Sequence, residues 1–468
     1  MYRFRPAFAC LTLCLFAVVT AVQAEPAVSS AVAFSLSSTA GNLVKGPDGA
    51  YYGTANPVTS VAGGIVWRAT ADGSDVRTLY QLNPDNDAVT PGAGLLLASD
   101  GLFYGTTKFG KGSDSTGAGS IFRINPNGSG FTIIHRFAPV TSTNTDFNPV
   151  NTNGAYPEAE LIEGHDGLLY GVARTGGANG TGAIFRIQRD GQGFQALRVL
   201  DKNTAAASSG LLINTDGAAP TGPLVQDADG YLYGTASTGG ANGRGTVFRL
   251  AADGTGFQVL RTFPATTTTN GVAKNSDGGT PFAGLIDGGD GFLYGVASQF
   301  GPNGFGTIYS IKLQDLSFAV LHPFSNTDGA RPLAELRLSA NDGKLYGTTA
   351  GGGTNSGSTT EVSGLGTFFS IDRTGSNFTK LHNFAAKDGT GPASRVFEHA
   401  PGVFMGLTSS AGNCGYGTLW RYSAAGDTVT GNTTCGQKKS NQNSGGGHAG
   451  LLFLALLGIL GLGRRRNV

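Results

Sequence analysis

The chain has 468 residues, of which 76 are glycine, 13% are charged and 40% are hydrophobic. The hydrophobic content is enough for a packed core, which argues against a disordered body. The formal net charge of +1 excludes the basic surface that a nucleic-acid-binding protein presents to phosphates.

The N-terminus predicts export. A basic start is followed by an apolar run over residues 7–22, and the segment ends at a small residue, Ala24. This is the pattern of a secretory signal peptide over residues 1–24, cleaved after Ala24. Cys14 raises the alternative of a lipoprotein, which Leu13 disfavours because a small residue is expected before a lipidated cysteine.

Seven copies of one pattern follow. The clearest copy has an Asp-Gly turn, a Tyr-Leu-Tyr-Gly-Thr-Ala run at residues 231–236, a Gly-Thr-Val-Phe-Arg-Leu run at residues 245–250 and a Phe-x-x-Leu-x-x-Phe run at residues 257–263. The glycine of the first run recurs as Gly53, Gly105, Gly171, Gly234, Gly295, Gly347 and Gly406. A period of this size, with strand signals throughout, indicates a tandem-repeat protein.

Each copy reads as four strands. A short apolar stretch such as residues 220–225 precedes the Asp-Gly turn and is termed strand A, and the three runs that follow are strands B, C and D. Asp-Gly between two strand-like runs favours a hairpin, because glycine accepts the positive φ of the turn. The sequence therefore predicts an all-β fold, a seven-bladed β-propeller of four-stranded antiparallel blades, over residues 25–436.

The ends of the propeller are expected to meet in one blade. The seventh copy has strands B and C but no strand D, while the strand-like run at residues 31–36 belongs to no copy. We expect this run to complete the last blade. Cys414 and Cys435 lie in the same closing region, and in an exported chain they predict one disulfide rather than a metal site.

The C-terminus has three parts. A polar spacer at residues 437–443 is followed by a small-residue segment, an apolar run over residues 449–462 and a terminal Arg-Arg-Arg. The apolar run predicts a short hydrophobic helix, below the ~20 residues of a permanent membrane span. Residues 444–468 resemble the GlyGly-CTERM sorting signal of Gram-negative bacteria, which implies cleavage by the intramembrane protease rhombosortase in species with type II secretion. The processing residues that the resemblance implies are Ser444, Gly445, Gly446 and Gly447. The alternative is a plain C-terminal membrane anchor.

The repeat also resembles a known family. The runs Leu-Tyr-Gly-Thr at residues 232–235 and Gly-Thr-Val-Phe at residues 245–248 are similar to the "GloVer" tandem repeat of choice-of-anchor bacterial surface proteins. The resemblance covers roughly residues 40–425. It implies an architecture and a surface location, and it brings no catalytic residues with it.

Motifs for catalysis or cofactor binding are absent from the sequence. No nucleophile elbow, phosphate loop, zinc spacing or paired-carboxylate motif occurs. His135, His322 and His382 occupy one repeat position in three blades, so they are expected to be structural. The oxygen-rich segment at residues 145–154 has calcium as an alternative to a solvated turn, but no cofactor is expected.

Loop lengths single out one face. The A–B and C–D turns are tight, while the B–C and D–A connections are long and polar, as at residues 349–363, 138–156, 201–219 and 264–280. In an antiparallel four-stranded blade these long connections all lie on the same side. Loops held by a rigid scaffold commonly form binding sites, so this face and the channel mouth are the candidate site.

Two function classes remain open. The first is a non-enzymatic surface or secreted protein that binds a glycan, matrix polymer or protein. The second is a secreted polysaccharide hydrolase or lyase, which needs carboxylates that converge at the channel mouth. The candidate carboxylates come from only two blades and are Glu158, Glu160, Glu163 and Glu335. The first class is favoured, with export machinery, signal peptidase and a rhombosortase-type protease as processing partners and transient inner-membrane anchoring before release.

Overall fold

The computed structural model describes residues 27–33, 39–56, 63–85, 90–110, 117–144, 148–205, 211–353, 364–412, 415 and 417–424. These residues belong to the first of two compact units, Met1–Cys435, and the second unit, Gly436–Val468, lies outside them. Within the described part, no helix is both long and apolar enough to cross a membrane. The hydrophobic helix expected near the C-terminus lies outside the described residues.

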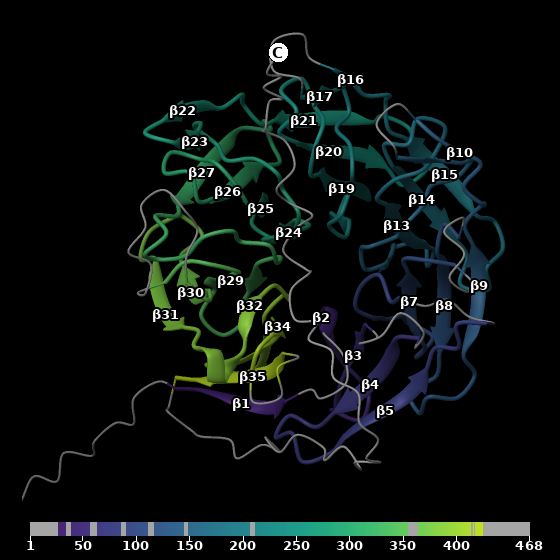
Figure 1. The fold of residues 1–468 in the computed structure, drawn as a ribbon, viewed down its shortest axis with the longest axis horizontal. Helices are drawn as coiled ribbons and strands as arrows, with labels where there is room; N and C mark the ends of the chain where they lie inside the picture. The colour runs from purple at the N-terminus through teal and green to yellow at the C-terminus, as the bar shows by residue number, and fades with distance from the viewer. Residues whose placement is uncertain are drawn as a thin grey trace, which may run out of the picture. The chain divides into compact units, whose positions relative to one another are not determined.

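Seven antiparallel sheets surround a common centre (Figure 1). Blade 1 consists of β2 (Thr39–Lys45), β3 (Tyr51–Ala55), β4 (Ile65–Ala69) and β5 (Val76–Gln81). Blade 2 consists of β6 (Leu96–Leu97), β7 (Phe103–Thr107), β8 (Ser120–Ile124) and β9 (Thr132–Arg136). Blade 3 consists of β12 (Ile162–Glu163), β13 (Leu169–Ala173), β14 (Ala183–Ile187) and β15 (Gln195–Val199).

The next three blades repeat the pattern. Blade 4 consists of β18 (Val225–Gln226), β19 (Tyr231–Ala236), β20 (Thr246–Ala251) and β21 (Gln258–Thr262). Blade 5 consists of β24 (Ile286–Asp287), β25 (Phe292–Ala297), β26 (Thr307–Lys312) and β27 (Phe318–Pro323). Blade 6 consists of β28 (Arg337–Leu338), β29 (Leu345–Thr349), β30 (Thr367–Ile371) and β31 (Thr379–Asn383).

The seventh blade joins the two ends of the propeller. It contains β33 (Phe397–Ala400), β34 (Val403–Ser410) and β35 (Thr418–Ser423), with β32 (Thr390–Pro392) also paired to β34 and a short helix η1 (Ala386–Asp388) before it. The N-terminal strand β1 (Ala27–Ala33) pairs antiparallel with β35, as the purple and yellow strands show in Figure 1. This strand begins earlier than the run at residues 31–36 that the sequence suggested. The fold is an all-β seven-bladed propeller with mainly four-stranded blades, which confirms the predicted fold class.

Each recurrent Tyr-Gly-Thr strand carries its glycine for a packing reason. In every blade this glycine is the cross-strand partner of an aromatic residue on strand C, as for Gly234 and Phe248. A Cβ added to Gly234 would lie 2.6 Å from the Phe248 ring, closer than side chains approach one another. The corresponding distances run from 2.4 Å at Gly105 to 2.6 Å at Gly347. Glycine is therefore required because the aromatic ring lies directly on its backbone.

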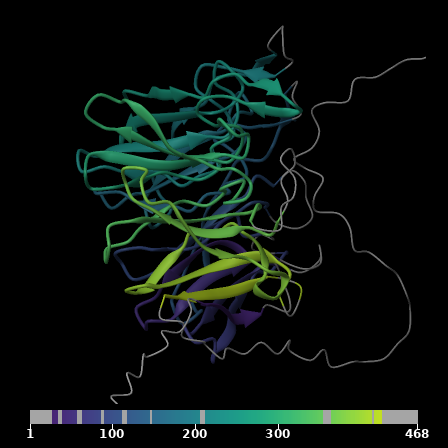
Figure 2. The same ribbon diagram turned by 90° about the vertical axis from the view of Figure 1, so that its left-hand side faces the viewer.

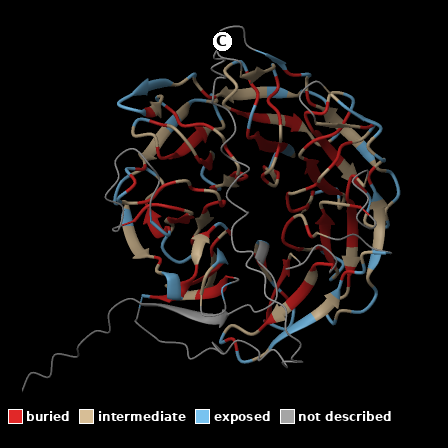
Figure 3. Ribbon diagram, in the orientation of Figure 1, coloured by how far each residue is buried: buried red, intermediate tan, exposed pale blue. Residues whose placement is uncertain are grey.

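Hydrophobic side chains fill the spaces between blades. The described core separates into seven clusters, and each cluster joins two neighbouring blades. One of them joins blade 1 to blade 7 through Trp67, Met405 and Leu419, which closes the ring. Figure 3 shows buried positions gathered on strands B and C within the blades and exposed positions on the outer strands. The strands of the seventh blade are seen from the side in Figure 2.

Tyr309 is the aromatic residue that faces the strand B glycine in blade 5, and it carries a hydroxyl that its counterparts lack. It stands where the other blades have Phe or Trp, is 0% exposed, and its hydroxyl has no hydrogen-bond partner in the described part. We predict that Tyr309→Phe raises the free energy of unfolding by about 1 kcal/mol, because a buried unpaired donor is removed while the ring is kept. Urea unfolding measures the change.

Tyr294→Phe is the matched control. The Tyr294 hydroxyl donates to Asp290 Oδ2 at 2.9 Å, so its removal is expected to cost about 1 kcal/mol. If both substitutions destabilise equally, the Tyr309 hydroxyl has a partner and the prediction is wrong.

Candidate functional site

One register of the seven A strands lines the central channel. It is the position before the buried aliphatic residue that stands within strand A in blade 1 and directly before strand A in the other six blades, and each blade contributes one residue to it. In blade order these residues are Asn42, Gly94, Glu160, Pro223, Gly284, Glu335 and Arg395. Since strand A enters the sheet from the D–A connection, this ring lies toward the long-loop face. The four polar members, Asn42, Glu160, Glu335 and Arg395, are called the channel cluster.

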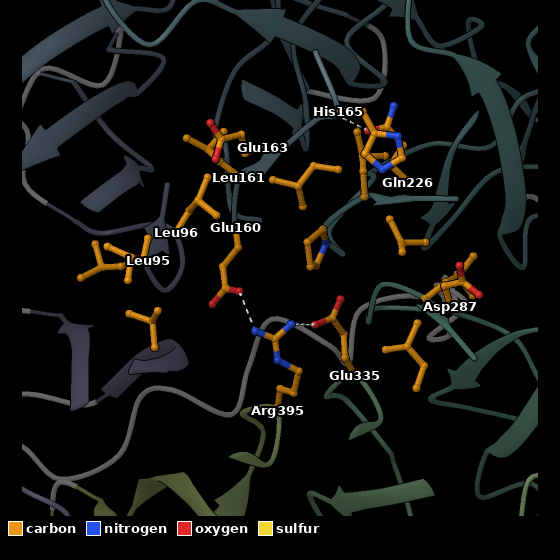
Figure 4. Close-up of a pocket in the computed structure, with 18 residues that line it drawn as sticks. Leu95, Leu96, Glu160, Leu161, Glu163, His165, Gln226, Asp287, Glu335 and Arg395 are labelled. Atoms are coloured by element: carbon orange, nitrogen blue, oxygen red, sulfur yellow. Dashed lines mark hydrogen bonds and ion pairs between the residues drawn. The ribbon is translucent and has the colours of Figure 1, made fainter. Parts of the chain in front are cut away.

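Arg395 connects the two glutamates across the channel (Figure 4). Its Nη1 donates to Glu335 Oε2 at 2.9 Å, and its Nη2 lies 3.6 Å from Glu160 Oε2. Asn42 completes the network, because its backbone N–H donates to Glu160 Oε1 at 3.0 Å and its Oδ1 accepts from the Arg395 backbone N–H at 2.5 Å. The cluster thereby links blades 1, 3, 6 and 7, including the two blades at which the ring closes.

Burial sets the electrostatics of the channel cluster. Glu335 is 5% exposed and Glu160 is 8% exposed. Burial raises the pKa of Glu335 to about 7, and the Arg395 guanidinium opposes this shift without cancelling it. Burial also acts to lower the pKa of Arg395, but the two carboxylates outweigh it and hold that pKa above its usual value. Arg395 is thus the charged partner of two buried carboxyl groups at one end of the channel.

Two glycines make room for the glutamates. A Cβ on Gly94 would lie 2.0 Å from Glu160 Oε1, and a Cβ on Gly284 would lie 2.3 Å from Glu335 Oε1. Side-chain atoms do not approach this closely, so the small residues of this register are needed as much as the charged ones. The blades that carry no charge here accommodate the carboxylates of their neighbours.

Below the channel cluster the channel becomes apolar and then polar again. A cavity of about 590 Å³ is bounded by aliphatic residues two positions further along strand A, among them Val44, Leu96 and Ile162. At its other end, near the tight A–B turns, lie Glu163, His165, Gln226 and Asp287 (Figure 4). The channel therefore has a polar ring toward each face and an apolar middle.

Only two of the four carboxylates proposed from sequence belong to the channel cluster. Glu160 and Glu335 meet at Arg395. Glu158 instead forms ion pairs with Lys108 and with Arg174.

Glu163 lies at the opposite end of strand A. Its Oε2 accepts from the Ser99 backbone N–H at 2.7 Å, and Arg189 lies 3.2 Å from its Oε1. It joins blade 3 to blade 2. Sequence reasoning missed Asn42 and Arg395, although both occupy the same register as Glu160 when the A strands are aligned.

The three histidines of one repeat position do not converge. The His135 ring stacks on Phe194 of the next blade at 4.0 Å between centroids, and the His322 ring stacks on Phe378 at 3.8 Å. His322 Nε2 and His382 Nε2 contact Asp328 and Asp388 at 3.1 and 3.2 Å. Burial lowers the pKa of His135 to about 4. These rings fill space between outer strands, and no group of metal-ligating residues occurs among the described residues.

Several predicted positions lie outside the described residues. They are Ala24, Ser444, Gly445, Gly446 and Gly447 of the processing sites, the paired Cys414 and Cys435, and Cys14. They stay predictions.

The fold and its channel define a tandem-repeat β-propeller protein. The sequence matches the family described as the Gloeobacter/Verrucomicrobia repeat over residues 39–275 and 211–361. The chain belongs to this family. A search of curated proteins gave no match.

Solved structures share the propeller architecture at low identity. A GH74 enzyme from Niastella koreensis is 14% identical with a TM-score of 0.50, covering 81% of this chain and 52% of its own. An oligogalacturonate lyase from Vibrio parahaemolyticus is 9% identical with a TM-score of 0.49, covering 85% and 97%. A nidogen/laminin complex contains a chain that is 17% identical with a TM-score of 0.38, covering 69% and 91%. At 14% identity, the similarity to the GH74 enzyme is one of fold alone.

We predict that Arg395→Met lowers the free energy of unfolding by roughly 2–3 kcal/mol. The substitution keeps most of the side-chain volume but leaves the carboxylates of Glu160 and Glu335 without their cation. Adding Glu335→Gln to this variant is expected to restore part of the loss, because one uncompensated buried charge is then removed. Urea unfolding of the single and double variants measures both effects.

Arg373→Met provides the control. Arg373 Nη1 contacts Asp290 Oδ2 at 3.0 Å, but both side chains are about one-third exposed. Its loss is expected to cost under about 1 kcal/mol. Equal destabilisation by the two substitutions contradicts a special role for the channel cluster.

Proposed function

We propose that this protein is an exported, non-enzymatic propeller that binds an extracellular polysaccharide through its long-loop face. The observation that carries the proposal is the row of three hairpins inserted into successive D–A connections. They are β10 (Ser142–Thr143) with β11 (Pro149–Val150), β16 (Thr204–Ala205) with β17 (Leu212–Ile213), and β22 (Thr267–Thr269) with β23 (Val272–Lys274). They extend the loop face beside the outer strands of three consecutive blades (Figure 1).

Each hairpin is fixed at its base by one asparagine. Asn275 Nδ2 donates to the carbonyls of Pro264 and Gly278 at 2.9 Å, and its Oδ1 accepts from the backbone N–H groups of Gly278 and Gly301. Asn151 and Asn214 make equivalent bonds in the two preceding connections. Three of the four bonds join the D–A loop to itself, and the fourth joins it to the following B–C loop. The described base of each hairpin, held this way, loses little conformational entropy when a ligand binds.

The exposed strands of the hairpins suit a hydroxylated polymer. Ser142, Thr143, Thr204 and all of β22 are exposed. Their hydroxyls both donate and accept hydrogen bonds, as do those of a sugar chain, and none of these side chains carries a charge. A protein partner is the other outcome that the binding experiment distinguishes.

Export and processing follow from the two ends of the sequence. The segment over residues 1–24 supplies a signal peptide, and residues 444–468 supply a tail similar to GlyGly-CTERM signals.

We predict that the mature protein begins at Glu25 and ends within residues 444–447, because signal peptidase and a rhomboid-type protease remove the two ends. Intact-mass analysis of protein released by a Gram-negative host with type II secretion measures both termini, and Gly445→Val with Gly446→Val is expected to block the second cut. Release of a chain that still carries the apolar tail contradicts the processing.

We predict saturable binding of the mature protein to at least one polysaccharide on a glycan array, without shortened products in mass spectra. Replacing residues 264–274 by one serine removes the third hairpin. The design copies the next D–A connection of the chain, in which the single residue Ser325 links Phe324 to Asn326. The replacement is expected to weaken binding about tenfold, since one of three contact elements is lost.

The Tyr309→Phe variant is the control for this measurement, because it alters a buried residue and leaves the loop face intact. Unchanged binding by the hairpin replacement contradicts the proposed surface.

A second candidate is a polysaccharide hydrolase or lyase, and it rests on the channel cluster. Two carboxylates from different blades lie at the channel mouth, and one of them has a raised pKa, as a general acid requires. Against it, both oxygens of Glu160 are engaged, and Arg395 lies between the two carboxylates. Cleavage products in the array experiment that disappear with Glu335→Gln favour this candidate.

A further inference from the structure

A second cavity opens on the face opposite the long loops. It has a volume of about 480 Å³ and lies between the turns of blades 3 and 4. Its lining includes His165, Asp166, Asp229, Tyr231 and Asp253. His165 and Gln226 line both this cavity and the channel cavity, so the two spaces adjoin. The cavity is called the blade 3–4 groove.

The other blades show what the turns of this face normally do. In blade 3, Asp166 Oδ2 accepts from the Tyr170 hydroxyl at 2.7 Å and Oδ1 accepts from the Leu168 backbone N–H at 3.1 Å. The same two bonds recur in blades 1, 2, 5 and 6, where the aspartates are Asp48, Asp100, Asp290 and Asp342. The aspartate of the Asp-Gly turn is therefore normally a structural residue whose carboxylate is occupied.

Blade 4 breaks this rule. There Asp227, two residues earlier, accepts from the Tyr233 hydroxyl at 2.8 Å and from the Tyr231 backbone N–H at 2.9 Å. Asp229 keeps its place in the Asp-Gly turn but makes no side-chain hydrogen bond or ion pair to any described residue. Because Asp227 makes both structural bonds of the turn, the Asp229 carboxylate is not needed for them. It lines the groove instead.

Two further residues of the groove differ from their counterparts in the other blades. Tyr231 stands where the other blades have Ala50, Leu102, Leu168, Phe292, Lys344 and Val403. It is 38% exposed and is the single aromatic among the exposed large hydrophobic residues of the described part. His165 is exposed and stands where neighbouring blades have Ser99 and Ala228. Three exceptions in one cavity are not required for folding, because the other blades fold without them.

The charges around the groove favour a neutral ligand. Its described lining contains no lysine or arginine, which disfavours an anionic ligand. The Arg249 guanidinium lies 5.1 Å from the centre of the Tyr231 ring, and Arg186 Nη1 donates to the Ala252 carbonyl at 3.0 Å. These two guanidinium groups offset most of the charge of the three carboxylates that line the groove, Asp166, Asp229 and Asp253. Within the described residues, the carboxylates do not form a group that could hold a metal ion. What remains is a ligand with many hydroxyl donors and an apolar face.

We propose that the blade 3–4 groove binds a neutral pyranose unit of a saccharide chain, with Tyr231 as the apolar platform and Asp229 and His165 as hydrogen-bonding partners. A pyranose presents C–H groups that pack on an aromatic ring and hydroxyls that donate to a carboxylate. This site rests on the proposed polysaccharide binding and extends it. A propeller that binds saccharide on both faces holds two polysaccharide segments together. It does not require the hairpins.

The test is isothermal titration calorimetry of the mature protein with neutral hexasaccharides of glucose, mannose, xylose and N-acetylglucosamine, and with hexagalacturonate and spermidine as charged probes. We expect at least one neutral hexasaccharide to bind. Tyr231→Leu, which reproduces the residue of blades 2 and 3, is expected to weaken that binding about tenfold, and Asp229→Asn by about fivefold. Phe292→Leu, at the same register in blade 5, is the control and is expected to leave affinity unchanged.

The outcomes separate this site from the hairpin face. No binding of any neutral hexasaccharide up to about 10 mM overturns the site, as does binding that neither variant weakens. Spermidine binding that Asp229→Asn abolishes, without saccharide binding, replaces it with a cation site and also overturns it. If the hairpin replacement loses polysaccharide binding and Tyr231→Leu does not, the proposed function stands and the groove is not a saccharide site. If Tyr231→Leu loses polysaccharide binding and the hairpin replacement does not, the groove is the binding site and the hairpin face is not.

Discussion

The contact of one glycine with one aromatic ring in each blade is the constraint on which the fold depends. In all seven blades an added Cβ on this glycine would lie within 2.6 Å of the ring, so no other residue fits. The ring that lies on the glycine also faces the neighbouring blade, where Phe248 packs beside Tyr170 and Ile184 of blade 3. Intrablade and interblade packing are thus made by the same side chain. This coupling explains why strand B varies so little along the chain while the connecting loops vary freely.

A ring of repeats must close, and closure imposes a demand that a linear array does not have. The seam between blades 7 and 1 is sealed by a hydrophobic cluster and by the pairing of β1 with β35. At the channel end of the same seam, the Arg395 backbone N–H of blade 7 donates a hydrogen bond to Asn42 Oδ1 of blade 1. Arg395 then reaches Glu335 and Glu160. The blades at the seam are therefore tied to the opposite side of the ring by the channel cluster.

Sequence reasoning predicted the propeller but only half of the channel cluster. The fold was accessible because Asp-Gly turns and aromatic strands recur with a fixed spacing, and local signals of this kind survive without tertiary information. Strand A gives a weak signal, because in five blades it is only two residues long, as at β6 and β12. Glu158, Glu160 and Glu163 lie within six residues, and only the pairing register shows which of them faces the channel. Arg395 lies in the degenerate seventh copy, where no motif draws attention to it.

Residues that depart from the repeat fall into two physical classes. Glu160, Glu335 and Arg395 satisfy one another within the protein, so their departure is explained by ring closure. The side chains of Asp229 and His165 make no hydrogen bond or ion pair to a described residue, and the Tyr231 ring contacts the Arg249 guanidinium at its exposed site, while Asp227 makes the structural bonds of the turn. An internally satisfied exception stabilises the fold, whereas an unsatisfied and exposed one leaves binding capacity on the surface. On this criterion the channel cluster is primarily structural, and a ligand is expected in the blade 3–4 groove.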